Sequence, residues 1–305
     1  GGDIRLAVGK GIGTDIIGGD IIATAGDVSA FTGGLIRVAT GKSDASSSGA
    51  IYIQSSNAGD LGVSGSLMFS TGTTSSGSSG YLKLASGNAV GGKAGDMLVV
   101  LGTGDTGAGG DILMNAGASS DSADGTGGAI RLTSGYGTQS SSGAVVLKSS
   151  NAGVGGVSGM LQFRTGEASS GSSGSISLAT GNAAASGEGG NILLQVGSGT
   201  EGNGGGISMV AGAITGTGIG GSISGTAGAS ASTTGGSINL LSGAGTASSS
   251  GSIVLRTAAS GLNGVSGALT FATGTAKLGS SGLVEVLSGS ATGGKGGDIR
   301  LAVGK

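Results

Sequence analysis

Acidic residues that recur at matching points of a repeated sequence are the first candidates for chemistry. Asp3 with Asp20, and Asp96 with Asp111, each follow a glycine one repeat apart. Stacked repeats would bring the two carboxylates of each pair to within roughly 5 Å of each other, near the separation of the two catalytic carboxyl groups in a retaining glycosidase. No cluster of Lys, Arg or His adjoins them, and Asp after Gly commonly closes a turn through its own backbone. We favour the turn role over a cation site, and a cation site over catalysis.

Other binding motifs and the composition point away from an enzyme. The string GGD lacks the regular second Asp of calcium-binding repeats. Gly289–Gly296 approximates a phosphate loop but has no Ser or Thr after Lys295. The chain has no His and no Cys, and its net charge is -2, which excludes thiol chemistry and a basic nucleic-acid footprint. We predict no catalytic residue, no metal, no cofactor and no nucleic-acid partner.

A short register runs through the whole chain. An aliphatic residue stands two positions after a glycine, and a second apolar residue follows two positions later. The aliphatic residues, here the first column, are Ile4, Ile21, Ile36, Ile51, Leu67, Leu82, Met97, Ile112, Ile130, Val145, Leu161, Ile176, Ile192, Ile207, Ile223, Ile238, Ile253, Leu269, Val284 and Ile299. The second column is apolar except at Gly225. First-column spacings are mostly 15 or 16, with 17 after Ile4 and 18 after Ile112.

Apolar residues at alternate positions predict short, half-buried β-strands. A repeat of this length cannot bury its own apolar face, but stacked copies can. We therefore expect an all-β fold, a flattened parallel β-solenoid with about 19 coils of 15–16 residues per 295-residue unit and uncapped ends. Its handedness is open. The glycine ahead of each strand would serve a corner that needs positive φ or close backbone approach, and Pro, which is absent, would remove a hydrogen bond.

Longer periods lie above the single repeat. We expect one continuous segment over residues 1–305, with blocks at 48–141, 142–249 and 250–305, the third continuing into 1–47 of the next unit. Phe69, Phe163 and Phe271 mark the second repeat of each block. The string GGDIRLAVGK occurs at 1–10 and again at 296–305. This return predicts an open-ended polymer, either covalent tandem copies or units stacked head to tail.

The strings GGDIRLAVG, SGSISLATG and GGSINLLSG resemble the glycine-rich repeat regions of cell-surface proteins in algae and oomycetes, including those of flagellar hairs. The resemblance covers the whole chain, although the EGF-like Cys framework common in neighbouring domains of such proteins is missing. It implies an extracellular, glycan-decorated appendage.

These observations predict a structural fibre outside the cell that associates with itself, end to end and by lateral bundling. The alternatives are a repetitive adhesin stalk that presents a binding domain elsewhere and, as a minor one, an ice-binding solenoid, which would need an outward Thr array that is absent. For lateral contact we single out Leu98, Val100 and Leu113 as an exposed apolar patch. The candidates for O-linked sugars are Thr73, Thr74, Ser75, Ser76, Ser169 and Ser170. No apolar run reaches the ~18 residues of a membrane helix.

Overall fold

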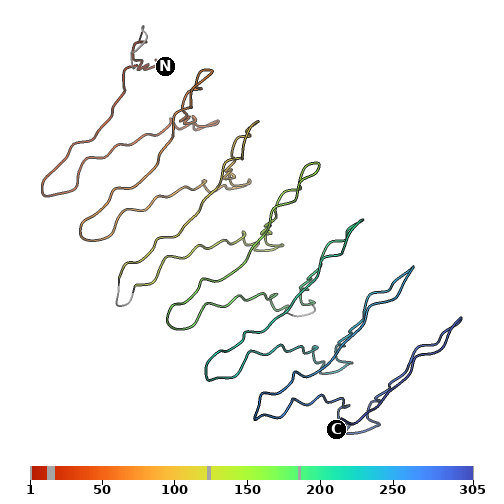
Figure 1. Ribbon diagram of the computed structural model, residues 1–305. Coiled ribbons are helices and arrows are strands. Elements are labelled where there is room, and N and C mark those ends of the chain that lie inside the picture. Colours follow the sequence, from red (N-terminus) through yellow and green to blue (C-terminus); the bar gives the residue numbers. More distant parts are fainter. Residues whose placement is uncertain (1, 12–17, 122–124, 185–186, 305) are drawn as a thin grey trace. The chain divides into compact units, whose positions relative to one another are not determined.

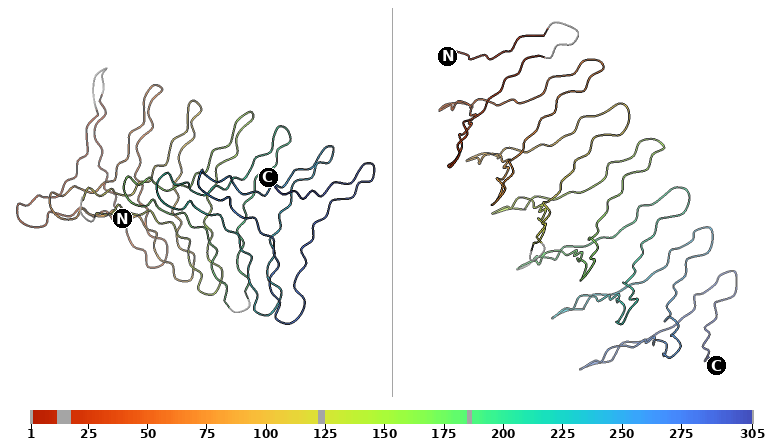
Figure 2. Two further views of the ribbon diagram at one scale, coloured as in Figure 1. Left: turned by 60° about the horizontal axis from the view of Figure 1, so that its bottom comes forward. Right: turned by 60° about the vertical axis from the view of Figure 1, so that its left-hand side comes forward.

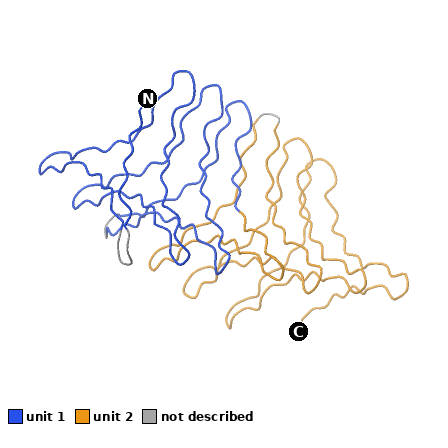
Figure 3. Cartoon of the chain, turned by 90° about the horizontal axis from the view of Figure 1, so that it is seen from above, with its two compact units in different colours: residues 1–147 blue, residues 148–305 orange. Residues whose placement is uncertain are grey.

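The backbone of this protein has no regular secondary structure in the part that can be described. The computed structural model describes residues 2–11, 18–121, 125–184 and 187–304, and within them it contains neither a helix nor a strand (Figure 1). The chain divides into two units, Gly1–Leu147 and Lys148–Lys305 (Figure 3). Inside each unit the backbone runs out and back in successive loops (Figure 2), so the sequence repeat is kept as a repeat of loops.

The prediction of an all-β, flattened parallel β-solenoid with about 19 coils is therefore wrong. A sheet needs hydrogen bonds between adjacent segments. The backbone–backbone hydrogen bonds among the described residues instead join positions that are three to eleven apart in the chain, such as Gly34 to Gly26 and Gly128 to Gly117. Because these bonds close local loops, they do not pair the apolar segments of successive repeats. The strands expected around the first column are unpaired extended backbone.

The described residues do not form a hydrophobic core either. None of the described residues is buried, and the accessible surface of the chain is 30487 Å². A compact monomer of 27.8 kDa would expose roughly 11,000 Å², and its unfolded chain roughly 40,000 Å². The burial of an apolar face that was expected from stacked repeats is thus absent from the described residues.

The recurrent packing contact is a glycine against a small side chain at the base of each loop. We call the glycine two positions before a first-column residue the corner glycine. A Cβ built on the corner glycine of each repeat from Gly19 onward would lie within 4 Å of the residue four positions after the preceding first-column residue. That facing residue is Ala, Ser or Thr in all repeats except those of Val8, Leu101 and Val196. The two ends of every loop therefore meet at this contact.

Several of the least exposed residues lie at the same contact. The residues of intermediate exposure include Ala25, Ser134, Thr165, Ala211, Ala227 and Ser242. Each of these six is the facing residue of a corner glycine. At these six corners the facing residue is therefore partly shielded, whereas at the other corners it is exposed.

Of the two reasons expected for glycine at the corner, the structure gives close approach. The described glycines with positive φ are Gly77, Gly91, Gly107, Gly155, Gly171, Gly202 and Gly279. They lie inside the loops, three or four residues before a corner glycine. There the chain reverses in a conformation that L side chains disfavour.

Candidate assembly surface

The apolar columns keep the alternation that the sequence predicts, although no sheet forms. In the segment Ile253–Leu255 the side chains are 53%, 72% and 55% exposed, so the middle residue is the most exposed of the three. The same order holds for Met97, Leu98 and Val99, at 60%, 85% and 67%. Each segment therefore has a column face, made by its first- and second-column side chains, and an opposite face made by the middle residue.

The predicted lateral patch lies on the opposite face and beside it. Leu98 and Leu113 are middle residues and are 85% and 82% exposed, and Val100, which follows the second column, is 72% exposed. All three side chains are accessible, and they stay a predicted contact surface.

The predicted glycosylation residues are exposed, and one of them already has a hydrogen bond. Thr73, Thr74, Ser75, Ser76, Ser169 and Ser170 are all exposed. The Thr74 hydroxyl donates to the carbonyl oxygen of Ser76 at 3.0 Å. Its hydroxyl therefore bonds locally, within the loop.

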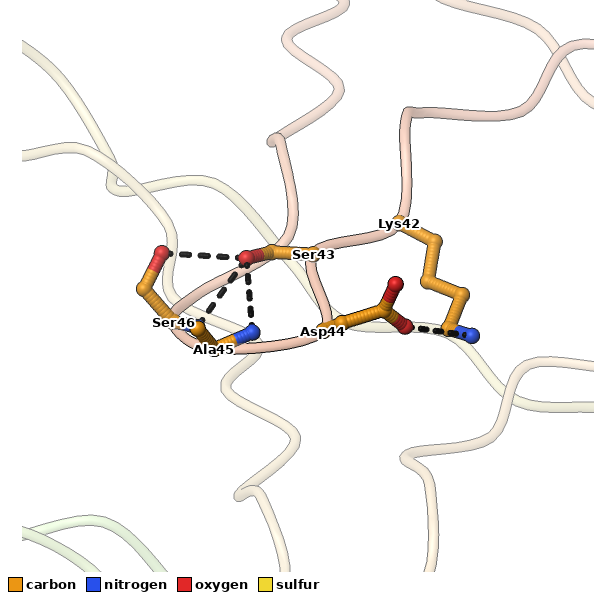
Figure 4. Close-up of polar contacts among 5 residues, drawn as sticks. All are labelled: Lys42, Ser43, Asp44, Ala45 and Ser46. Atoms are coloured by element: carbon orange, nitrogen blue, oxygen red, sulfur yellow. Dashed lines mark hydrogen bonds and ion pairs between the residues drawn. The ribbon is translucent and has the colours of Figure 1, made fainter.

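Other hydroxyls in the loops close turns in the same local way (Figure 4). The Ser43 Oγ accepts from the backbone N–H groups of Ala45 at 3.4 Å and Ser46 at 3.0 Å, beside an exposed Lys42–Asp44 ion pair of 2.6 Å. Ser230 accepts from the backbone N–H of Thr233 at 3.0 Å. This is the turn chemistry of a hydroxyl side chain, and hydrogen bonds from repeat to repeat are not needed to explain these loops.

The acidic residues do not gather into a site in the described part of the chain. Asp96 accepts from Lys93 Nζ at 2.9 Å, and both side chains are largely exposed. The described residues contain no group of three or more Asp, Glu, His or Cys side chains that could hold a metal ion. A shallow hollow lined by Arg256, Thr257, Ala258 and Ala259 consists of one continuous stretch, so it brings no distant groups together.

Two further findings bear on partners. The residues that the structure describes include no helix with the length and apolar character to span a membrane. Comparisons of the chain with protein-family models, with curated proteins and with solved structures find no match. The resemblance to algal and oomycete surface proteins therefore stays a sequence-based expectation.

The facing residue of the corner is the feature that sequence reasoning missed. The register included the glycine but not the small residue four positions after each first-column residue, although Ala25, Thr40, Ser55 and Thr71 already show it in successive repeats. A column of small residues at a fixed offset from a column of glycines indicates two backbones in close contact. That signal was present in the sequence.

Proposed function

We propose that this chain is a structural component of an extracellular filament, in which 295-residue units follow one another end to end. The observation that carries the proposal is the return of GGDIRLAVGK at 296–305 in the same register as at 1–10. A protein whose repeat continues into its own first repeat can extend without limit, which is the requirement for a filament.

The surface chemistry supports a passive structural role. Charged residues make up 10% of the chain, and the candidate acidic residues Asp3, Asp20, Asp96 and Asp111, each next to a corner glycine, are exposed. We assign no enzymatic activity and no cofactor to the chain. The resemblance to glycine-rich surface proteins supports a location outside the cell, and the exposed Thr73–Ser76 and Ser169–Ser170 hydroxyls support decoration with O-linked sugars.

Electron microscopy of two purified proteins tests this function. One protein contains a single 295-residue unit, residues 11–305, and the other contains two such units in tandem. We expect both to form filaments of equal diameter, because the junction inside the tandem protein repeats the junction between single units. A matched variant with Ile299→Ser and Leu301→Ser in the terminal repeat should form shorter filaments. Particles that stay single and monodisperse at all concentrations would refute the proposal.

A further inference from the structure

We propose that Asn203 is a site of spontaneous deamidation, at which the side-chain amide is converted to a carboxylate and part of the product is isoaspartate. The inference goes beyond the structural role proposed above and does not depend on filament formation. The reaction is fastest where glycine follows the asparagine, because a side chain on the next residue hinders attack by its backbone nitrogen. Of the nine asparagines in the chain, Asn203 and Asn263 are the two that precede a glycine.

The chemistry joins the backbone nitrogen of Gly204 to the side chain of Asn203. That nitrogen gives its proton to hydroxide and attacks Asn203 Cγ, so that an N–Cγ bond forms and the Cγ–Nδ2 bond breaks. Ammonia leaves after it takes a proton from water, and a succinimide ring remains. One water molecule then opens the ring at either of its two carbonyl carbons. Opening at one carbon gives aspartate, and opening at the other gives isoaspartate, whose main chain runs through Cβ.

A backbone hydrogen bond distinguishes the two candidate sites. The N–H of Gly264 donates to the carbonyl oxygen of Gly261 at 3.2 Å, so a tight turn holds the nitrogen that would attack Asn263. Among the described residues, no group accepts a hydrogen bond from the N–H of Gly204, and a Cβ built there would meet nothing within 4 Å. Both Asn-Gly pairs are exposed, so access of water does not separate them. Asn203 is therefore the reactive site, and Asn263 is the protected one.

The loop that contains Asn203 also lacks the hydrogen bond that closes the loop after it. In that next loop the N–H of the corner glycine, Gly221, donates to the carbonyl oxygen of Gly212 at 2.9 Å. Within the described part of the chain, the corner glycine Gly205 makes no such bond, and its facing residue is Val196 rather than Ala, Ser or Thr. The backbone before Gly205 is thus less constrained, which favours the rotation that ring closure needs.

The two products differ in their effect on the corner. Both add one negative charge close to Glu201, but isoaspartate alone lengthens the main chain, by one methylene two positions before Gly205. The corner has no room for such a shift, because a Cβ at position 205 would lie 2.8 Å from Val196 Cγ1. We therefore expect isoaspartate at position 203 to displace Val196 from the corner and aspartate to leave it in place.

Peptide mapping by mass spectrometry tests the assignment of the site. The purified full chain is incubated at mildly alkaline pH, in buffer and in concentrated urea, and the acid forms at Asn203 and Asn263 are measured over time. In urea the turn at Gly264 is lost, so the ratio of the two rates there is the reference. In buffer we expect the ratio to favour Asn203 by a further two- to tenfold or so, about the effect of one hydrogen bond. The same ratio in buffer and in urea would overturn the assignment.

A pair of alanine substitutions tests the attacking atom. Neither Gly204 nor Gly206 is among the glycines with positive φ, and a Cβ at either position would meet nothing within 4 Å. Gly204→Ala places a methyl group beside the nucleophile and should abolish most of the deamidation at Asn203. Gly206→Ala is the matched control and should leave the rate unchanged. Equal rates in the two variants would overturn the role of the Gly204 nitrogen.

Nuclear magnetic resonance of the separated products tests the effect on the corner. The variant Asn203→Asp has the added charge without the added methylene. We expect the methyl resonances of Val196 to shift in the isoaspartate form and to stay in place in Asn203→Asp. Unchanged resonances in the isoaspartate form would overturn the displacement of Val196. These measurements use the dissolved chain, so their outcome is distinguishable from the presence or absence of filaments.

Discussion

Replacing one corner glycine by alanine should open its loop, whereas the same replacement at a second corner should not. The backbone N–H of Gly34 donates to Gly26 O at 2.9 Å, and that of Gly251 donates to Gly243 O at the same distance. Each of the two loops is thus closed by a hydrogen bond of its own, between residues eight positions apart. The two corners differ in the room that they leave for an alanine side chain. A Cβ at position 34 would lie 3.0 Å from Ala25 Cβ and 3.0 Å from Gly26 N, whereas a Cβ at position 251 would lie 3.5 Å from Ser242 Cβ.

These distances set the sign and size of the effect. Contacts of 3.0 Å are well inside the optimal separation of about 3.5–4.0 Å, and overpacking of this kind costs about 1–3 kcal/mol. Replacing Gly by Ala at an unstrained φ gains about 0.4–1 kcal/mol by restricting the unfolded chain, and neither Gly34 nor Gly251 is among the glycines with positive φ. Gly34→Ala should therefore destabilise the closed loop, and Gly251→Ala should leave it unchanged or stabilise it. The two variants should differ by about 1–3 kcal/mol, or roughly five- to 150-fold in the loop-opening equilibrium.

Amide hydrogen exchange at the substituted position measures that equilibrium, since the amide is protected only while the loop is closed. Protection factors should be corrected for the intrinsic exchange rates of Gly and Ala. We expect protection to fall at position 34 and to hold or rise at position 251. Gly221→Ala is an independent replicate, because a Cβ there would lie 3.0 Å from Gly212 N. A fall of equal size at positions 34 and 251 would show that the corner contact does not determine the choice of glycine.

Three further predictions concern the surface. Leu98→Ser combined with Leu113→Ser should reduce lateral bundling, because it removes an exposed apolar patch; unchanged filament diameter in electron micrographs would argue against that patch. Glycopeptide mass spectrometry of the native protein should find O-linked sugars on some of Thr73, Thr74, Ser75, Ser76, Ser169 and Ser170, and bare peptide at all six would reject the assignment. Lys93→Ala should leave the backbone chemical shifts beyond its own loop unchanged, because its 2.9 Å pair with Asp96 is exposed and screened by salt; shifts that spread to neighbouring repeats would contradict this.

The register of the repeat could be predicted from sequence because it depends on local chemistry. Alternating apolar residues fix which side chains share a face of an extended segment, and the lower exposure of Ile253 and Leu255 than of Val254 agrees with it. For the corner glycines the sequence left two reasons open, positive φ or close backbone approach, and the contact at Gly34 shows close approach. Both features involve residues that lie within about one repeat of each other.

The pairing between repeats could not be predicted, because alternation does not say which segment supplies the hydrogen bonds. The backbone N–H of Gly34 and the carbonyl of Gly26 close a loop within one repeat, so this pair of groups does not join neighbouring segments into a sheet. The absence of Pro was expected to preserve hydrogen bonds between neighbouring strands of one chain. The described backbone forms no such bonds, so the absence of Pro does not indicate a sheet. The candidate surface at Leu98, Val100 and Leu113 rested on a face that the sequence could define, but the sequence pattern does not say what contacts that face.

In the proposed filament, the order of each repeat depends on association between copies. Fixing a residue's backbone costs about 1–2 kcal/mol, and a fully buried aliphatic side chain returns about 1.5–3 kcal/mol, which the isolated chain forgoes because none of its described residues is buried. Closing a loop of about nine residues costs only about 2 kcal/mol in chain entropy, and one hydrogen bond with one corner contact can offset much of that. Each repeat can therefore hold its column residues at regular intervals before a partner arrives. In the proposed filament, the burial that stabilises each repeat is gained between copies, because the described residues form no core of their own although the mean hydropathy of the chain is +0.30.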